Sequence, residues 1–459
     1  MLMLSLLILL LIGFLTVNIF WLKDDIFKSF GLKFWLAFGI GSGITSIMYF
    51  FHTLFMGSNF KSVIIYEIFF LLILAVILFF RNPKFSVCRK ETLSNNALSK
   101  VISISFFVTA FSSLVSFIIF SLKDPHGNWD AWGIWNMHAR FIYRLNNHLA
   151  DFFQNCPDWS HPDYPLFIPS AIARCWKYIN YEQLLAAIVI AMLFTFGLVF
   201  LLSSSLSIFK NKNQGYLAGM VMLSTFTFMY QGASQCADIP IAFFFLATII
   251  LLCLKDKYNE NSLLILAGIT AGLSLWCKNE GAVFIISIFI ARFSAVLFDK
   301  GFKIATKELI LFFAGLFPVL SGIIYFKVQL TPANDIFLNQ GIDDFLTRII
   351  DPTRYTEIFS YFFISVKHYF GKLAGLPLLM VYALFAGINI NKEYKSSIIT
   401  IIMTLYLMLM GYFGIYLITP HDLQWHLSTS LYRLLLQLWP IFLFLFFMIV
   451  KTPEETLKR

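Results

Sequence analysis

The sequence predicts an all-α polytopic membrane protein. Hydrophobic residues make up 59% of the 459 residues, charged residues make up only 13%, and the mean hydropathy is +0.77. A water-soluble core of this length could not bury so much apolar surface. Runs of about 20 apolar residues, the length that an α-helix needs to cross about 30 Å of hydrocarbon, recur along the chain. A transmembrane β-barrel would instead show short segments in which polar and apolar residues alternate.

Apolar runs separated by charged residues predict about thirteen transmembrane helices. The first run has neither a basic start nor a small-residue cleavage site, so we expect a retained span and not a signal peptide. The predicted spans cover residues 1–22, 33–54, 62–80, 101–122, 182–208, 214–230, 239–254, 262–276, 282–298, 309–328, 373–390, 396–418 and 434–450.

Lysine and arginine residues are concentrated in one set of short connections between the predicted spans. The positive-inside rule assigns these connections to the cytoplasm, so the chain is expected to begin outside and to end inside. The net charge of +9 mostly reflects this bias, and it does not support binding to nucleic acid. Outer loops are then predicted at 123–181, 329–372 and 419–433. Their mixture of aromatic and charged residues is typical of amphipathic helices that lie in the membrane interface.

Three tryptophans surround Asp130 directly after a predicted span, in the sequence GNWDAWGIWN at 127–136. A carboxylate at this place lies over the membrane surface, where lipid-linked substrates present their head groups. Asp130 could take a proton from an acceptor hydroxyl, and we expect Trp129 and Trp132 to contact the substrate. The structural alternative is that Asp130 caps a helix beginning near Ala131.

Two further polar motifs lie beside apolar spans. Asp238 precedes Pro240, which is typical of an N-cap followed by a first-turn proline, and the functional alternative is a second acid beside Asp130. Lys278 and Glu280 lie between two short apolar runs, where each charged group needs water, a partner or a substrate. A simple ion pair is the structural alternative to Lys278 binding a lipid phosphate and Glu280 binding a metal or a sugar hydroxyl.

Arg433 ends the last predicted outer loop. Its planar guanidinium fits a pair of phosphate oxygens better than lysine does, although an arginine here could also simply extend to the interface. We expect Arg433 and Lys278 to bind the donor phosphate, with His426 nearby in the substrate site. A metal site made by His421, Asp422 and His426 is disfavoured, because the two histidines do not share a helical face.

Prolines bracket an aromatic turn that contains Trp159, His161 and Tyr164. Sugar rings present C–H faces that stack on aromatic side chains, which makes His161 and Tyr164 candidate substrate-binding residues. An aromatic belt at the membrane interface is the alternative interpretation.

The order and spacing of these motifs resemble the GT-C superfamily of membrane glycosyltransferases, in particular protein O-mannosyltransferases and lipid A aminoarabinose transferases. The resemblance rests on Asp130 in the first long outer loop, on SQCADIP at 234–240 and on CKNEG at 277–281. It covers roughly residues 101–300. Three predicted spans come before 101–122, the span that leads into the Asp-bearing loop, whereas in many members a single span precedes that loop. In place of the usual close acidic pair, Asp130 has only Asp124 upstream.

The resemblance implies an inverting hexosyl or pentosyl transferase that moves a sugar from a polyprenyl phosphate to a glycan, lipid or protein acceptor. The reaction would take place at the periplasmic or extracellular face of a bacterial-type inner membrane. Asp130 and Asp238 would be the catalytic acids, and Asp238 and Glu280 would be candidate ligands of a divalent Mg²⁺ or Mn²⁺. The implied parts are N-terminal membrane helices at 1–100, a catalytic transmembrane core at 101–300 and C-terminal helices at 301–459.

Two other classes of membrane protein compete with this interpretation. An O-antigen ligase or polymerase would also use a lipid-linked glycan, but it would rely on arginine and histidine in a late outer loop, here Arg348, Arg354 and His368. A transporter would place ionisable groups near mid-membrane and show inverted halves. Glu67 and Arg292 are the candidates within predicted spans, and the sequence shows no such halves.

Overall fold

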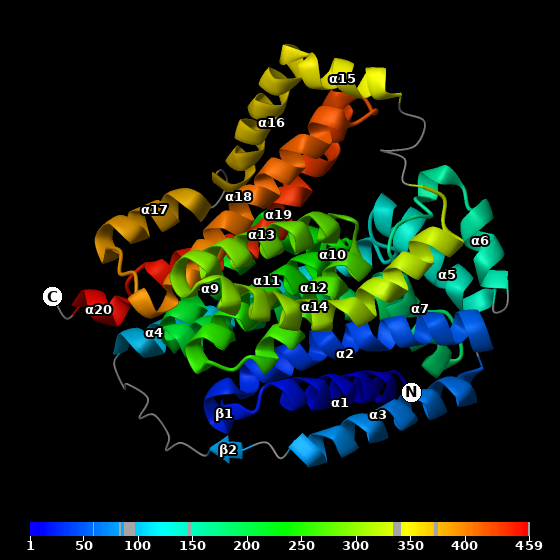
Figure 1. Cartoon of the computed structure of the whole chain (residues 1–459), viewed down its shortest axis with the longest axis horizontal. Coiled ribbons are helices and arrows are strands. Elements are labelled where there is room, and N and C mark those ends of the chain that lie inside the picture. Colours follow the sequence, from blue (N-terminus) through cyan, green and yellow to red (C-terminus); the bar gives the residue numbers. More distant parts are fainter. Residues whose placement is uncertain are drawn as a thin grey trace.

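The computed structural model describes residues 1–57, 59–81, 84–86, 97–145, 148–333, 341–370 and 375–457 (Figure 1). Helices make up nearly all of the regular structure among these residues, and the one pair of strands there, β1 (Lys23–Asp25) and β2 (Lys84–Ser86), is short and parallel. The predicted all-α class is confirmed, with many helices long and apolar enough to cross a membrane.

The helices follow one another through mostly short connections. The first part of the chain contains α1 (Leu2–Phe20), α2 (Ile26–Met56), α3 (Phe60–Arg81), α4 (Ala97–Lys123), η1 (Ala131–Trp135), α5 (Asn136–Arg144), α6 (Leu149–Asn155), η3 (Asp158–Ser160), α7 (Phe167–Ile179), α8 (Leu184–Phe209), α9 (Lys212–Ser224) and α10 (Phe226–Ala233). The second part contains α11 (Asp238–Tyr258), α12 (Ser262–Cys277), α13 (Glu280–Lys300), α14 (Phe302–Tyr325), η4 (Phe326–Leu330), α15 (Ile342–Ile350), α16 (Pro352–Phe370), α17 (Gly375–Ala386), η5 (Lys392–Tyr394), α18 (Lys395–Ile418), α19 (Leu423–Ile449) and α20 (Pro453–Leu457).

Ten of the described helices are long and apolar enough to cross a membrane, and they coincide with ten of the predicted spans. The other three predicted spans are shorter. Residues 214–230 are divided between α9 and α10 at the extended residue Thr225, 262–276 form the 16-residue α12, and 373–390 contain the 12-residue α17. The predicted number of spans is therefore not confirmed, because apolar composition does not distinguish a continuous span from a short or divided helix.

Two segments predicted as outer loops are largely helical. Residues 352–370 form α16, which packs on α18 and α19 (Figure 1). Most of 419–433 belongs to the first turns of α19, whose N-cap is Asp422, and the Asp422 carboxylate accepts the backbone N–H of Trp425 at 2.8 Å. Arg433 consequently lies inside α19, about three turns from its start.

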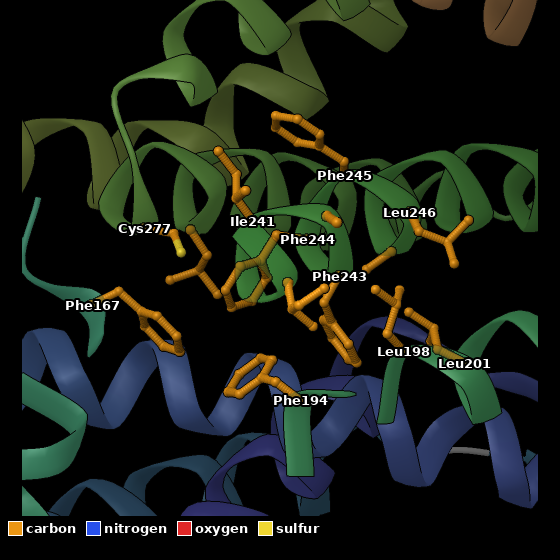
Figure 2. Close-up of a cluster of buried hydrophobic side chains, with 14 of the residues drawn as sticks. Phe167, Phe194, Leu198, Leu201, Ile241, Phe243, Phe244, Phe245, Leu246 and Cys277 are labelled. Atoms are coloured by element: carbon orange, nitrogen blue, oxygen red, sulfur yellow. The ribbon is translucent and has the colours of Figure 1, made fainter. Parts of the chain in front are cut away.

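Helix α11 is enclosed by its neighbours, since every residue in 238–255 is buried. Its Phe243 and Phe244 pack against Phe194 of α8, with ring centroids 5.4 and 6.0 Å apart (Figure 2). A helix that is apolar on all sides is stable only in such a position. This packing fixes the place of Asp238, the first residue of α11.

Glycines allow two pairs of helices to approach closely. At Gly13 of α1 a Cβ atom would lie 1.8 Å from the carbonyl oxygen of Ala37 in α2. At Gly268 of α12 it would lie 2.0 Å from the carbonyl oxygen of Phe312 in α14. Small residues at such crossings permit the van der Waals contact that drives helix association in membranes. A larger residue at either position would push the two helices apart.

The segment that carries Asp130 lies at one end of the helices, which we call the site end. Figure 1 shows the N-terminus, α5, α6 and α7 at this end, and β1, β2, α20 and the C-terminus at the opposite end. Helix α5 packs on α7, and α7 packs on α2, so the segment rests on the membrane-spanning core. The two termini lie at opposite ends, as the predicted topology requires. Which end faces the cytoplasm stays a prediction.

Candidate functional site

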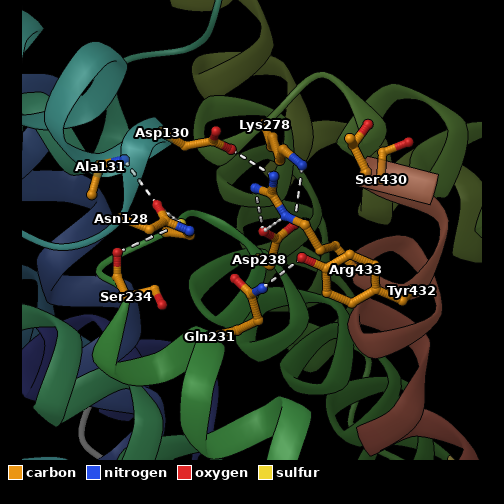
Figure 3. Close-up of polar contacts among 12 residues, drawn as sticks. Asn128, Asp130, Ala131, Gln231, Ser234, Asp238, Lys278, Ser430, Tyr432 and Arg433 are labelled. Atoms are coloured by element: carbon orange, nitrogen blue, oxygen red, sulfur yellow. Dashed lines mark hydrogen bonds and ion pairs between the residues drawn. The ribbon is translucent and has the colours of Figure 1, made fainter. Parts of the chain in front are cut away.

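Asp238 is the centre of a polar cluster at the site end (Figure 3). Its carboxylate is fully buried and accepts hydrogen bonds from Lys278 Nζ at 3.0 Å, Arg433 Nε at 2.8 Å and Gln437 Nε2 at 2.8 Å. Arg433 adds a second contact through Nη2, 2.7 Å from the same Asp238 oxygen. The N-cap of α11 is Ala237 and not the predicted Asp238. The Asp238 carboxylate instead binds side chains from other parts of the chain.

Arg433 joins Asp238 to Asp130. Its Nη1 atom lies 2.6 Å from Asp130 Oδ2, so a single guanidinium bridges the two carboxylates (Figure 3). The exposure of the two acids differs, because the side chain of Asp130 is 32% exposed and that of Asp238 is 0% exposed. The structure thus brings together the two acids expected in one site. Solvent reaches Asp130 and not Asp238.

Asp130 lies at the start of a helix that another residue caps. Asn128 Oδ1 accepts the backbone N–H of Ala131 at 3.3 Å, and the Asn128 carbonyl accepts that of Trp132 at 2.9 Å. The Asp130 carboxylate makes no capping hydrogen bond, so the structural alternative for this residue is wrong. Residues 131–135 form a π-helix, η1, a rare element that occurs frequently at functional sites.

Lys278 lies in the two-residue connection between α12 and α13, and Glu280 is the first residue of α13. Lys278 Nζ is 2.6 Å from Glu280 Oε1 and 3.0 Å from Asp238 Oδ1, so one ammonium contacts two carboxylates. Burial disfavours the charge of Lys278, but the Asp238 and Glu280 carboxylates outweigh this effect and raise its pKa above the ordinary value. Lys278 is therefore a permanent cation. The ion pair considered as the structural alternative is present, together with the contact to Asp238.

Gln437 completes the cluster and was missed by the sequence reasoning. It lies one turn after Arg433 on α19 and donates to Asp238 and, at 3.4 Å, to Glu280 Oε1. Its own Oε1 accepts the Tyr412 hydroxyl of α18 at 3.0 Å. An amide inside an apolar span is the signal that could have found it, because a polar group at membrane depth needs a partner.

A second set of hydrogen bonds fixes the Asp130 segment to the loop before α11. Asn136 Nδ2 donates to Gln235 Oε1 at 3.1 Å, and Gln235 Nε2 donates to the Pro125 carbonyl at 3.0 Å. These contacts hold Gln235 at a φ of 60°, a left-handed conformation that is uncommon outside glycine. Burial raises the pKa of Cys236 to about 12, so its thiol stays protonated and donates to Asn128 Oδ1 at 3.1 Å.

His161 and Tyr164 of the aromatic turn lie beside the cluster. Their rings stack with centroids 4.5 Å apart, and Tyr164 stacks in turn on Trp135 of η1 at 5.6 Å. The structure therefore places both predicted residues at the edge of the site.

Asp163, between these two residues in sequence, ties the turn to the membrane helices. Asn279 Nδ2 donates to Asp163 Oδ2 at 3.0 Å, and Lys327 of η4 lies 3.1 Å from the same oxygen. Lys327 also donates to Asn279 Oδ1 at 2.8 Å. Asn279 stands between Lys278 and Glu280 in the chain. Its contacts with Asp163 and Lys327 therefore hold the connection that contains Lys278 in place.

The remaining predicted substrate-binding residues are Trp129, Trp132 and His426. Trp129 and Trp132 are 53% and 54% exposed, and their ring centroids are 5.6 Å apart. His426 lies on α19 about two turns before Arg433. Its Nδ1 atom is 3.0 Å from Thr419 Oγ1.

The predicted metal ligands do not fit a divalent cation. The ammonium of Lys278 lies between Asp238 and Glu280, at 3.0 and 2.6 Å. Across the described ranges, no group of three or more histidine, cysteine, aspartate or glutamate side chains is arranged to hold a metal. Lys278 occupies the place that a metal would need, and Arg433 beside it would repel a second cation.

The arginines that would favour a ligase contact backbone carbonyls. Arg354 Nη2 donates to the Tyr416 carbonyl at 2.9 Å, and Arg348 Nη1 donates to the Ile418 carbonyl at 3.4 Å. Both arginines thus contact the backbone at the end of α18. The side chain of His368 lies outside the described part of the structure.

The charges that would favour a transporter lie in buried ion pairs. Glu67 Oε1 of α3 is 2.6 Å from Arg174 Nε of α7. Arg292 Nη2 of α13 is 2.7 Å from both Asp256 Oδ1 and Glu308 Oε2. Each group therefore has a structural partner from another helix.

Comparison with known proteins supports a membrane glycosyltransferase that uses a polyprenyl-phosphate sugar. The family described as dolichyl-phosphate-mannose-protein mannosyltransferase matches residues 161–326. The resemblance predicted from the sequence is confirmed over this part of the chain. The match includes Asp238 and Lys278, whereas Asp130 and Arg433 lie outside it. No curated protein and no solved structure matches the chain significantly.

Proposed function

We propose that this protein is an inverting glycosyltransferase that moves a sugar from a polyprenyl phosphate to an acceptor hydroxyl. The observation that carries the proposal is the shared guanidinium of Arg433, which contacts the buried Asp238 and the accessible Asp130 at the site end. This arrangement puts a candidate base next to candidate phosphate-binding cations. The family match to transferases named for a lipid-phosphate donor supports the same class of reaction.

We further propose that the site end faces the periplasm or the cell exterior. The helix ends and connections at the opposite end, such as 210–212, 255–257 and 300–307, contain several lysines. Short connections rich in lysine and arginine favour the cytoplasmic side. The donor would then reach the site from the outer leaflet of a bacterial-type inner membrane.

In the proposed reaction, the acceptor oxygen attacks the anomeric carbon of the donor sugar as the bond from this carbon to the phosphate oxygen breaks. The electron pair of the broken bond leaves with the polyprenyl phosphate, and the configuration at the anomeric carbon inverts. Asp130 takes the proton of the acceptor hydroxyl as general base, since it is the accessible carboxylate. Arg433 and Lys278 stabilise the negative charge that grows on the departing phosphate.

Arg433 has to change partners before it can bind a phosphate. The carboxylates of Asp130, Asp238 and Glu280 already surround the charges of Arg433 and Lys278. The contact between Asp130 and Arg433 is the easiest of these to break, because Asp130 is partly exposed and contacts Arg433 through one guanidinium nitrogen. We infer that the donor phosphate displaces Asp130 from Arg433 and thereby frees the base. The donor is then expected to bind before the acceptor.

Asp238 has a positioning role in this proposal. Its buried carboxylate already accepts hydrogen bonds from Lys278, Arg433 and Gln437, so it is poorly placed to take a proton from an acceptor. It holds the two cations at fixed positions. Glu280, 20% exposed, is assigned to a hydroxyl of the donor sugar.

The experiment that tests the base is the Asp130→Asn substitution in purified protein in lipid nanodiscs. Release of polyprenyl phosphate from a panel of polyprenyl-phosphate sugars is measured in the presence of acceptors. We expect turnover to fall by about 10²–10⁴-fold, the usual contribution of a general base. Asp124→Asn, which changes a nearby exposed carboxylate, is the matched control and should keep its turnover. Nearly unchanged turnover in folded Asp130→Asn protein would remove Asp130 from this role.

A further inference from the structure

Three exposed tryptophans gather beside Asp130, and we call Trp129, Trp132 and Trp159 the tryptophan platform. Their side chains are 53%, 54% and 51% exposed. The ring centroid of Trp129 lies 5.6 Å from that of Trp132 and 5.5 Å from that of Trp159. Trp132 lies in η1, Trp129 lies two residues before η1, and Trp159 lies in η3. Two separate segments therefore supply the rings, and the fold brings them together.

Local structure holds the platform in place. Gly133 in η1 leaves room for the Trp129 ring, because a Cβ atom there would lie 1.9 Å from ring atom Cζ3. Trp159 belongs to the turn η3, which Ser160 closes by donating its hydroxyl to the Pro157 carbonyl at 2.7 Å. The rings are thus positioned by the backbone while about half of the surface of each tryptophan remains exposed.

The platform lies next in the chain to the carboxylate proposed as the base. Asp130 stands between Trp129 and Trp132 in the chain, and its side chain is 32% exposed. Arg433 contacts the same carboxylate from α19, on the side where the donor phosphate is expected. A molecule that covers the indole rings can therefore place a hydroxyl at Asp130 while the donor occupies the cations.

We propose that the tryptophan platform is the acceptor subsite and that the acceptor is the ring of a carbohydrate, carried by a glycan or a glycolipid. This inference rests on the proposed function. A pyranose ring presents apolar C–H faces that stack on indoles and hydroxyls that donate to a carboxylate. Exposed indoles with a carboxylate between two of them in the chain match both properties. A serine or threonine of a protein acceptor offers the hydroxyl but no ring face, so it would leave the indoles uncovered.

The test compares Trp132→Ala and Trp159→Ala with the matched control Trp425→Ala. Trp425 is 58% exposed at the start of α19 but is not part of the platform. Acceptor and donor KM values are measured in nanodiscs with polyprenyl-phosphate sugars as donors and alkyl disaccharides as acceptors. We expect the acceptor KM to rise about threefold to tenfold in each platform variant, the loss of one aromatic contact, with the donor KM unchanged. Trp159→Phe should restore part of the loss, and Trp425→Ala should match the unaltered protein.

Three results would overturn the inference. The first is an unchanged acceptor KM in both platform variants. The second is an equal rise of the acceptor KM in Trp425→Ala, because the tryptophans would then only anchor the protein at the membrane interface. The third is a serine- and threonine-containing peptide that serves as a better acceptor than every disaccharide. Turnover of a donor with the peptide would agree with the proposed function but would refute the inference that the acceptor is a carbohydrate. The absence of turnover with all donors and acceptors contradicts both.

Discussion

Arg433 contacts two carboxylates of very different exposure, and this difference separates their roles. Breaking a buried ion pair typically costs about 3–5 kcal/mol, whereas an exposed pair contributes about 0–1 kcal/mol. The contact with Asp238, whose side chain is 0% exposed, is therefore permanent, and the contact with Asp130 is exchangeable. Arg433 can thus stay bound to Asp238 while a phosphate replaces Asp130 as its second partner.

The Arg433→Lys substitution tests whether the planar fork of the guanidinium matters. Lysine keeps the charge but cannot contact Asp238 and a phosphate through separate nitrogens of a rigid fork. We expect the donor KM to rise about 10- to 100-fold, since one lost hydrogen bond to a charged group is worth about 1.5–3 kcal/mol. Donor titrations at saturating acceptor measure this effect.

Arg354→Lys is the matched control, because Arg354 also lies on a helix but contacts backbone carbonyls near the end of α18. Its donor KM should stay close to that of the unaltered protein. If Arg433→Lys protein has the same donor KM and turnover as the unaltered protein, Arg433 is an interface residue and not the phosphate ligand.

At the scale of elements, the short helix α5 secures η1 to the core through a buried histidine. His138 is 0% exposed, and its ring meets those of Phe152 and Phe153 edge to face at 5.8 and 5.9 Å. Burial lowers the pKa of His138 to about 3, with a further lowering by the charge of His161 and an opposing effect of Asp163. The imidazole is consequently neutral in the folded protein at ordinary pH.

This neutral histidine makes the stability depend on pH in a known direction. The unfolded chain binds a proton at His138 near pH 6.5, whereas the folded chain does so only near pH 3. The contribution of the neutral His138 to the free energy of unfolding is therefore complete above about pH 6.5 and is lost as the pH falls toward 3. At about 1.4 kcal/mol per pKa unit, the loss amounts to a few kcal/mol. We expect His138→Leu to flatten this decline in thermal unfolding curves recorded between these pH values. His148→Leu, at a histidine that is 78% exposed, should leave the decline as it is. A decline that is equally steep in His138→Leu would show that other groups cause it.

The helical elements also show what the sequence could and could not predict. The spans that are long and apolar, such as α3 and α8, were predicted within a few residues of their observed ends. The division at Thr225 was missed, because the bend depends on one extended residue inside an apolar run. Helix α16 was missed as a packing element, because its contacts with α18 and α19 depend on tertiary structure.

At the scale of the whole molecule, a buried ion pair links three elements near the site end. Arg174 of α7 meets Glu67 of α3 at 2.6 Å and donates to Ser5 Oγ of α1 at 2.8 Å. Both charged side chains are 1% exposed. Because α3 buries few of its other residues against the protein, this pair fixes its position.

Replacing Arg174 by methionine should therefore lower the stability strongly. The uncompensated carboxylate of Glu67 would remain buried, at a cost of about 3–5 kcal/mol. The midpoint of thermal unfolding in detergent measures the loss, and the double variant with Glu67→Leu should recover much of it. Arg144→Met is the matched control, since Arg144 is 58% exposed in its pair with Glu182 and should contribute about 1 kcal/mol or less. Equal midpoints for the two arginine variants would contradict this role of Arg174.

The candidate site could be predicted in part from the sequence. A carboxylate or a cation next to an apolar span, as at Asp130, Asp238 and Lys278, is costly without a function or a partner, and this signal found them. The sharing of one guanidinium between two acids could not be predicted, because Arg433 comes from a helix distant in sequence. Gln437 was missed because an amide carries no charge, so its position inside an apolar span is a weaker signal than that of a carboxylate or a cation.

The exchange of Asp130 for a donor phosphate on Arg433 is tested most directly by a structure of the protein with a polyprenyl-phosphate sugar bound. We predict that the phosphate oxygens lie at charge-assisted hydrogen-bond distance, about 2.7–2.9 Å, from Arg433 and Lys278. Asp130 should be released from Arg433, with its carboxylate facing the tryptophan platform, while Asp238 keeps its hold on the arginine. A phosphate bound elsewhere, with Arg433 still joined to Asp130, would contradict the exchange and the assignment of Arg433 as the phosphate ligand.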